Sequence, residues 1–155
     1  MITYKEDEKL IEIMHDIVSV LNMKHVNKSR VFCLRSKGSA SRHTIARCHA
    51  LPKVMQLSLR TDPVYVLEFI SETFDKLSEE DKIRTIIHEL MHIPKAFGGG
   101  FRHHDYVCKR NVDKLYETYR VARKEPIKEQ NSNLSTEKQD SDKPFDSIRN
   151  FLFGS

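Results

Sequence analysis

Apolar residues recur with helical spacing near the start of the chain. Leu10, Met14, Ile17 and Leu21 follow one another at intervals of four, three and four residues, which predicts an amphipathic helix over residues 5–23. After residue 29 the apolar residues fall in short runs rich in β-branched and aromatic side chains, which predicts strands. These runs are Val31–Leu34, Thr44–Cys48, Val54–Leu57 and Val64–Ile70.

Helical spacing returns in the second half of the chain. Ser78 and the acidic residues after it are typical of a helix start, and an apolar stripe then predicts a helix over residues 79–93. Pro94 ends this helix, and the glycines at 98–100 allow the chain to reverse. A last helix is predicted from about His103 to Arg123.

The pattern is lost after residue 123. Residues 124–144 are almost entirely polar and predict a flexible linker, whereas apolar residues return within 145–155 as a short interaction segment. The chain is therefore expected to have one α+β domain over residues 1–123, followed by a disordered tail. Within the domain we expect an N-terminal helix, a small mixed or antiparallel sheet and two further helices.

Length and composition fit this organisation. The chain has 155 residues, of which 39% are hydrophobic, enough for one modest globular domain. No apolar run approaches the length of about 20 residues that spans a bilayer, and the polar start is unlike a secretory signal. Three scattered cysteines, an odd number, favour reduced thiols, so we expect a cytoplasmic protein.

Positive charge is concentrated in one part of the chain. The net charge is only +4, yet the stretch from Asn22 to Thr61 has nine Lys or Arg and no Asp or Glu. Such a block suits a polyanionic partner, most simply the phosphates of a nucleic acid such as DNA. Alternatively, it is a solvated face whose counter-charges lie on flanking helices, and the sequence leaves both readings open. The candidate nucleic-acid-binding residues are Arg35, Lys37, Arg42 and Arg47.

The strongest chemical signal is the segment His88-Glu89-Leu90-Met91-His92. On a helix, His88 and His92 leave the same face one turn apart and can share a zinc ion, while Glu89 is placed to take a proton from water. A third histidine after the glycine turn would leave one coordination position open, as in catalytic zinc sites. On the predicted last helix, His104 lies on the inward stripe and His103 on the polar side, which favours His104. Cys108, one turn further, could also reach a metal, although a buried free cysteine is the simpler reading.

These residues resemble a known family. Tyr65–Phe69, Phe74–Ser78, His88–Pro94 and the segment Arg102–Asp105 look like the metallopeptidases of archaea and phages, which are related to the SprT-like zinc proteases. The resemblance covers residues 5–123. It implies a zincin-like α+β domain, one Zn²⁺ per chain held by three histidines, and a glutamate that acts as general base. Residue by residue, the implied ligands are His88, His92 and His104, and the implied base is Glu89.

The leading functional hypothesis is therefore a zinc-dependent endopeptidase acting on a protein or peptide. By resemblance to zincins, the strand at Val64–Ile70 is expected to be the sheet edge that pairs with an extended substrate, through Tyr65, Val66 and Leu67. Tyr106 and Arg102 are candidates to stabilise the oxyanion, and the sequence does not choose between them. A nucleic-acid-binding or clamp-binding adaptor with a non-catalytic metal site is an alternative, and a metal-dependent nuclease is a third.

The end of the chain suggests a partner. Residues 145–153 resemble the short motif by which replication and repair proteins bind the sliding clamp, with Ile148, Phe151 and Leu152 at its apolar positions. A tether of this kind would place the enzyme near DNA and predicts a DNA repair role, the removal of proteins bound or crosslinked to DNA. Alternatively, these apolar residues pack on their own domain or on a second copy.

Overall fold

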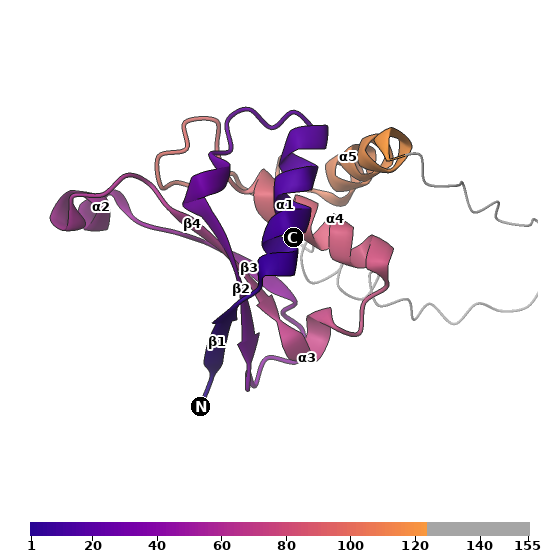
Figure 1. The fold of residues 1–155 in the computed structure, drawn as a ribbon, viewed down its shortest axis with the longest axis horizontal. Helices are drawn as coiled ribbons and strands as arrows, with labels where there is room; N and C mark the ends of the chain where they lie inside the picture. Colours follow the sequence, from indigo (N-terminus) through magenta and orange to yellow (C-terminus); the bar gives the residue numbers. More distant parts are fainter. Residues whose placement is uncertain (124–155) are drawn as a thin grey trace, which may run out of the picture.

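The computed structural model describes residues 1–123, which form a four-stranded sheet with helices packed against it (Figure 1). The elements in chain order are β1 (Thr3–Glu6), α1 (Glu8–Val20), a 3₁₀ turn (Lys28–Arg30), β2 (Val31–Lys37), β3 (Ala46–Ala50), α2 (Lys53–Leu59), β4 (Tyr65–Ile70), α3 (Ser71–Phe74), α4 (Glu79–Met91) and α5 (Lys109–Ala122). This arrangement confirms the predicted α+β class.

The sheet is mixed, with strand order β1-β2-β4-β3. Strand β4 runs parallel to β2 and antiparallel to β3, so it is bonded on both sides. The expectation that residues 64–70 form a sheet edge is therefore wrong. The edge beside β4 is β3, where Ala46 pairs with Phe69 and Ala50 pairs with Tyr65.

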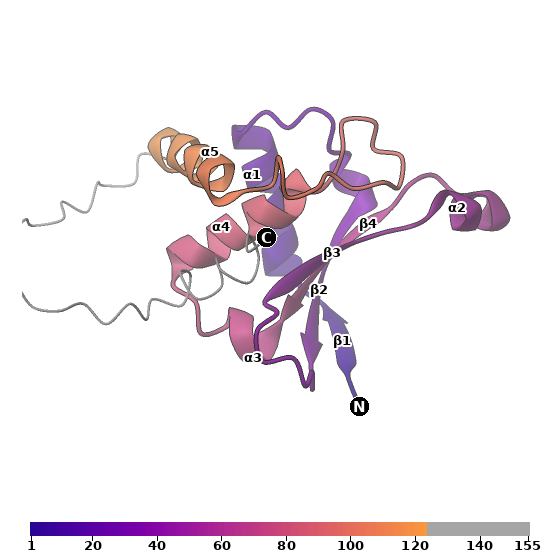
Figure 2. The ribbon, with the colours of Figure 1, turned by 180° about the vertical axis from the view of Figure 1, so that it is seen from behind.

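Helices α1, α4 and α5 lie together on one side of the sheet (Figures 1 and 2). Alternate residues of β4 face this layer, and Tyr65, Leu67 and Phe69 are fully buried there. Each of these side chains removes a large apolar surface from water, which stabilises the packing of helices on the sheet. The core therefore fixes β4, and through it the neighbouring edge strand β3.

The N-terminal residues form a strand that the sequence pattern did not reveal. Residues 3–6 pair with β2 as β1, and helix α1 begins only after Asp7. The Asp7 carboxylate accepts a hydrogen bond from the backbone N–H of Leu10 at 3.0 Å, which caps the helix. The predicted helix over residues 5–23 is thus shortened at both ends to Glu8–Val20.

The strand predicted at Val54–Leu57 is wrong, because these residues belong to helix α2. Both sides of β4 are already paired, so this apolar run cannot pair with the central strand. Pro52 lies at the N-cap of α2, and Arg60 ends the helix in the left-handed conformation, with φ at 52°. The helix projects away from the body of the molecule (Figure 1).

The last helix also begins later than predicted. Residues 103–108 form turns in which the backbone N–H groups of Tyr106 and Val107 donate to the carbonyl of His103, and α5 begins at Lys109. The helical stripe that favoured His104 therefore does not exist at that residue. Within residues 1–123, no helix is long and apolar enough to cross a membrane.

Candidate metal centre

The cluster of histidines begins at the C-terminal end of α4. The Ser78 hydroxyl accepts from the Asp81 backbone N–H at 3.2 Å and caps this helix, whose acidic first turn complements the helix dipole. His88 lies in the last turn and His92 is the C-cap, still in helical conformation. Their Nε2 atoms face each other at 3.2 Å.

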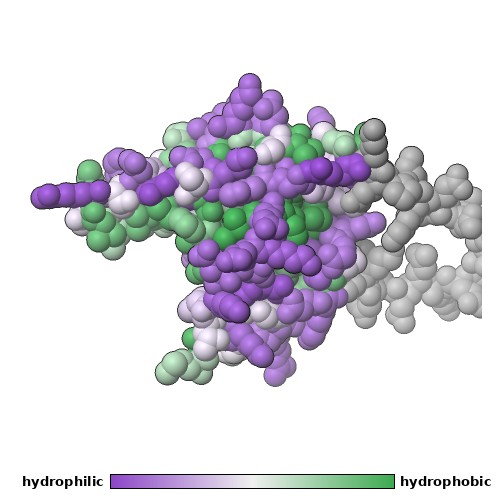
Figure 3. All heavy atoms as spheres, in the orientation of Figure 1, coloured by the Kyte–Doolittle hydropathy of each residue, from purple (hydrophilic) through white to green (hydrophobic). Residues whose placement is uncertain are grey.

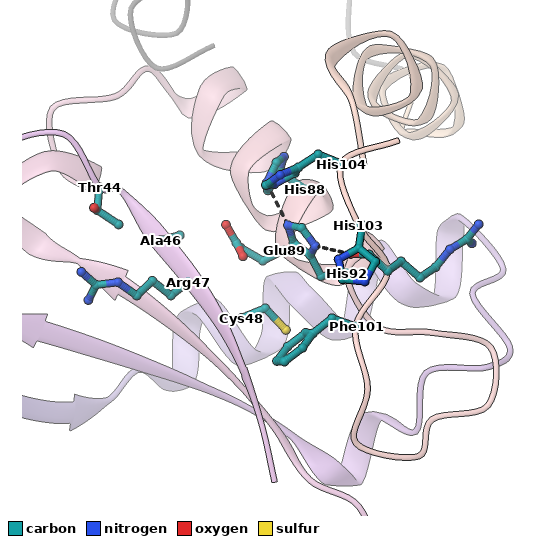
Figure 4. Close-up of a pocket in the computed structure, with 11 residues that line it drawn as sticks. Thr44, Ala46, Arg47, Cys48, His88, Glu89, His92, Phe101, His103 and His104 are labelled. Carbon is teal, nitrogen blue, oxygen red and sulfur yellow. Dashed lines mark hydrogen bonds between the residues drawn. The ribbon is translucent and has the colours of Figure 1, made fainter. Parts of the chain in front are cut away.

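The third histidine reaches the cluster from the loop after Pro94. The His104 ring centroid lies 5.1 Å from that of His92 and 5.9 Å from that of His88. The three rings can each offer a nitrogen such that all three nitrogens lie within 4.8 Å of one another. Figure 4 shows the three rings gathered beside Glu89.

Backbone hydrogen bonds hold the loop against the end of α4. The Arg102 backbone N–H donates to the His92 carbonyl at 2.8 Å. In return, the His92 Nδ1–H donates to the Arg102 carbonyl at 2.7 Å, which leaves Nε2 of His92 free of the proton. His92 is therefore oriented as a metal-binding imidazole usually is, with its second nitrogen fixed by a carbonyl.

Burial favours the neutral, metal-binding form of His88 and His92. Burial, together with the charges of His92 and His104, lowers the pKa of His88 to about 3. Burial also lowers the pKa of His92, in spite of its bond to the Arg102 carbonyl, and nearby His104 and His103 add to this effect. A neutral imidazole needs no proton release before it can coordinate a cation.

The donor set fits zinc. For Zn–N bonds of about 2.0–2.1 Å, two ligand nitrogens of a tetrahedral site lie about 3.3 Å apart. The 3.2 Å between the Nε2 atoms of His88 and His92 matches this spacing. Three imidazoles with one open position are the ligand type of catalytic zinc sites. Among the described residues, this is the one group of three or more His, Cys, Asp or Glu side chains able to hold a metal ion.

Glu89 lies between the histidines and the edge of the sheet (Figure 4). It is only 3% exposed, and burial raises the pKa of its carboxyl to about 8, although a hydrogen bond from the Cys48 backbone N–H opposes the shift. In the register of β3 with β4, Cys48 lies opposite Leu67 at a non-hydrogen-bonded pair, so its N–H points toward the free edge. The edge strand thus contacts the candidate base directly.

A cavity of about 510 Å³ opens onto these groups. It is bounded on one side by β3 and on the other by α4 and the loop after it. The lining residues are Thr44, Ala46, Arg47, Cys48, His88, Glu89, His92, Phe101, Arg102, His103 and His104. The cavity therefore joins the histidine cluster, the buried carboxyl and a free strand edge in one cleft.

The other candidates near the cleft are placed differently. His103 lines the cavity but lies outside the three-histidine cluster, and Cys108 is the half-buried N-cap of α5. Arg102 also lines the cavity, whereas Tyr106 lies under its guanidinium, whose carbon is 3.1 Å from the ring centroid. Tyr106 is thus positioned to support Arg102.

Strand β4, which was expected to bind the substrate, instead belongs to the core and anchors a loop. Tyr65 and Leu67 are fully buried and Val66 is half-buried, and the backbone of all three pairs with neighbouring strands. The Tyr65 hydroxyl accepts from the Gly99 backbone N–H and donates to the Gly100 carbonyl. Sequence reasoning missed this contact, because nothing in a strand pattern marks a tyrosine as the anchor of a distant loop.

The four basic candidates do not form one surface. Arg35 is bonded to Asp7 on the face of the sheet that carries α1, and it also pairs with Asp75. Arg47 lies on the opposite face and pairs with Glu68 at 3.6 Å. Lys37 and Arg42 are exposed. Ile148, Phe151 and Leu152, and the boundaries at 124–144 and 145–155, lie outside the described residues.

Comparison with known families agrees with a metal site in this cleft. The fold and the histidine cluster define an α+β protein with a candidate metal site. Residues 2–124 match the model of the family described as "Putative phage metallopeptidase", and the chain belongs to that family. Comparisons with curated proteins and with solved structures gave no match.

Proposed function

We propose that the chain is a zinc-dependent endopeptidase with its active site in the cleft between α4 and β3. The observation that carries the proposal is the convergence of His88, His92 and His104 beside the buried carboxyl of Glu89. Membership of a metallopeptidase family supports the same reaction class. The three histidines would hold one zinc ion, which supplies Lewis acidity and lowers the pKa of water toward about 7.

Glu89 is the proposed general base. It takes a proton from the attacking water and returns it to the leaving amine. A pKa raised to about 8 by burial suits a carboxyl that must both accept and release a proton near neutral pH. The Cys48 N–H fixes this carboxyl relative to β3, and therefore relative to any peptide bound along that strand.

The substrate is proposed to bind as an extended strand on β3. The backbone groups of Ala46, Cys48 and Ala50 face away from β4, because these residues occupy the non-hydrogen-bonded pairs of the ladder. The Cys48 N–H is already donated to Glu89, so a peptide would pair with the Cys48 carbonyl and with the backbone groups of Ala46 and Ala50. Among residues 1–123 no other strand pairs with this edge, and a strand edge of this kind can bind an extended peptide through backbone hydrogen bonds.

Of the two oxyanion candidates, Arg102 lines the cavity and Tyr106 does not. The Arg102 guanidinium packs on the Tyr106 ring, so it would have to turn toward the cleft to stabilise an oxyanion.

We limit the proposed function to peptide hydrolysis. Two of the four candidate DNA-binding residues, Arg35 and Arg47, lie on opposite faces of the sheet and are paired with carboxylates, which does not favour a single DNA-binding surface. Recognition of a sliding clamp would depend on residues outside the described part of the chain. DNA binding can be tested by measuring its salt dependence. Clamp recognition can be tested by calorimetry of the peptide 143–155 against a sliding clamp.

Hydrolysis of an unfolded protein, with and without zinc, tests the proposal. We expect chelation to abolish cleavage and zinc to restore it. Glu89→Gln should retain zinc and fold but lose a factor of about 10²–10⁴ in rate, as expected for a general base. Glu80→Gln, an exposed position on the same helix, is the matched control and should cleave normally. Cleavage by Glu89→Gln at the wild-type rate would contradict the mechanism and favour a non-catalytic metal site.

A further inference from the structure

Helix α2 exposes an unusual amount of apolar surface. Val54, Met55, Leu57 and Leu59 are 67%, 43%, 68% and 60% exposed, whereas Gln56 is the one buried residue of the helix. The helix forms the projection at the left of Figure 1, and hydrophobic residues are visible on that projection in Figure 3. A group of exposed apolar side chains on one projecting element typically marks a binding surface.

The base of this helix is fixed to the cleft. The Gln56 side-chain amide donates to the Leu51 carbonyl at 2.7 Å and to the Gly98 carbonyl at 3.0 Å. Gly99 allows this contact, because it has φ at +100° and an added Cβ would lie 2.5 Å from Gln56 Nε2. Leu51 follows the edge strand and Gly98 precedes the loop with His104. The amide of Gln56 therefore sets the position of α2 relative to both walls of the site.

The helix also lies on the path of a peptide bound to β3. Strand β3 ends at Ala50, and α2 begins at Lys53. A peptide paired antiparallel with β3 runs from the Ala50 end toward Ala46, so its residues before the scissile bond pass the end of the strand next to α2. At about 3.3 Å per residue, a short upstream segment of the peptide is enough to extend from Cys48 to α2.

The charges on and beside α2 indicate which peptide segments this helix can bind. Residues 46–60 contain Arg47, Lys53 and Arg60 but no Asp or Glu. Lys53 and Arg60 lie at the two ends of α2, on either side of its apolar residues. An apolar segment flanked by acidic residues complements this surface, whereas one flanked by basic residues is repelled.

We propose that α2 is a substrate-docking arm, which binds an apolar segment of an extended polypeptide upstream of the scissile bond. This inference rests on the proposed peptidase function and deepens it, since it names the substrate class as unfolded or extended polypeptides with apolar segments. The edge strand binds any sequence through its backbone, and α2 supplies the side-chain preference. Selection of substrates thus occurs outside the cleft that holds the histidines.

The test compares three peptides of equal length cleaved by the full chain. One carries a leucine block upstream of the scissile bond, one carries the block downstream, and one carries serines in its place. We expect the upstream block to lower KM at least about tenfold relative to the serine peptide, without a matching change in kcat. In Val54→Ser combined with Leu57→Ser, this preference should disappear. Val121→Ser, equally exposed on α5, is the matched control and should keep it.

A binding assay tests the docking-arm proposal separately from the proposed peptidase function. The fluorescently labelled upstream-block peptide is titrated into Glu89→Gln protein, with and without the two serine substitutions. If this binding depends on Val54 and Leu57 while the wild-type chain cleaves none of the three peptides, the result would support α2 as a docking arm and contradict the proposed peptidase function. Equal cleavage of all three peptides would contradict the docking-arm proposal and leave the proposed peptidase function intact. A dimer in sedimentation that dissociates in the double variant would instead assign α2 to an interface between copies and overturn the proposal.

Discussion

The hydroxyl of Tyr65 accepts a hydrogen bond from the backbone N–H of Gly99 at 2.9 Å, and it donates to the Gly100 carbonyl at 2.8 Å. Tyr65 lies on the central strand β4 and is fully buried. Gly99 lies in the loop between His92 and His104. One phenol therefore links the rigid core of the sheet to the loop that completes the histidine cluster.

Tyr65→Phe should weaken both the fold and the metal site. Loss of the hydroxyl leaves two backbone groups of the glycine loop without their partner, which should lower the free energy of unfolding by about 1–3 kcal/mol. Because the loop also carries His104, zinc affinity should fall by about 10–100-fold, as for other changes behind a metal ligand. Urea unfolding and competitive zinc titration measure the two effects.

Tyr4→Phe is the control for this change, since Tyr4 is 60% exposed on β1 and far from the loop in sequence. It should alter neither quantity. Unchanged zinc affinity in Tyr65→Phe would show that the loop holds its shape without the hydroxyl.

His104→Ala should lose the zinc ion, whereas His103→Ala should keep it. The His104 ring nitrogen belongs to the cluster within 4.8 Å, and His103 lies outside that cluster. Metal analysis of the two purified variants gives the answer directly. Loss of zinc from His103→Ala alone would transfer the third position to that residue.

Glu68→Gln should lower stability at neutral pH and have less effect in acid. Burial of Glu68 would raise its carboxyl pKa, but bonds to Ser36 and His49 and the charge of Arg47 offset this and leave the pKa lowered. Since the folded pKa lies below the unfolded value of 4.5, the stabilisation is present above pH 4.5 and is lost as the pH falls through the folded pKa. We expect a loss of about 1–3 kcal/mol near pH 7, measured by urea unfolding at several pH values. A pH-independent loss would mean that the charge of Glu68 contributes nothing.

Glu89→Gln should flatten the pH dependence of stability in metal-free protein. The folded carboxyl has a pKa raised to about 8, against 4.5 when unfolded, because of burial. Between these values the folded state binds the extra proton, so the free energy of unfolding should fall as the pH rises from 4.5 to 8. A glutamine cannot ionise and should remove this fall, as followed by thermal unfolding in chelator. Glu80→Gln should retain it, and an identical pH profile for both variants would argue against a buried, proton-holding Glu89.

Much of the site could be predicted from the sequence, because its first part is local. His88 and His92 lie one helical turn apart wherever this helix forms, and Glu89 is adjacent. Ser78 and Pro94 marked the ends of that helix closely. His104 was nominated through a helical stripe that is absent in the structure, since residues 103–108 form turns. The cluster nevertheless includes His104, as the family resemblance implies, so only the argument from the helical stripe is wrong.

The sequence by itself determined the α+β class, the helix that carries His88, Glu89 and His92, and the apolar residues that form the core. These features follow from periodicity and capping, which act between residues a few positions apart. Only the tertiary structure decided that β3 rather than β4 is the edge and that Cys48 contacts Glu89. It also decided that Tyr65 anchors the loop and that residues 53–59 form an exposed helix. Strand order and long-range hydrogen bonds join residues distant in sequence, and the free energy that selects them comes from packing the whole sheet against its helices.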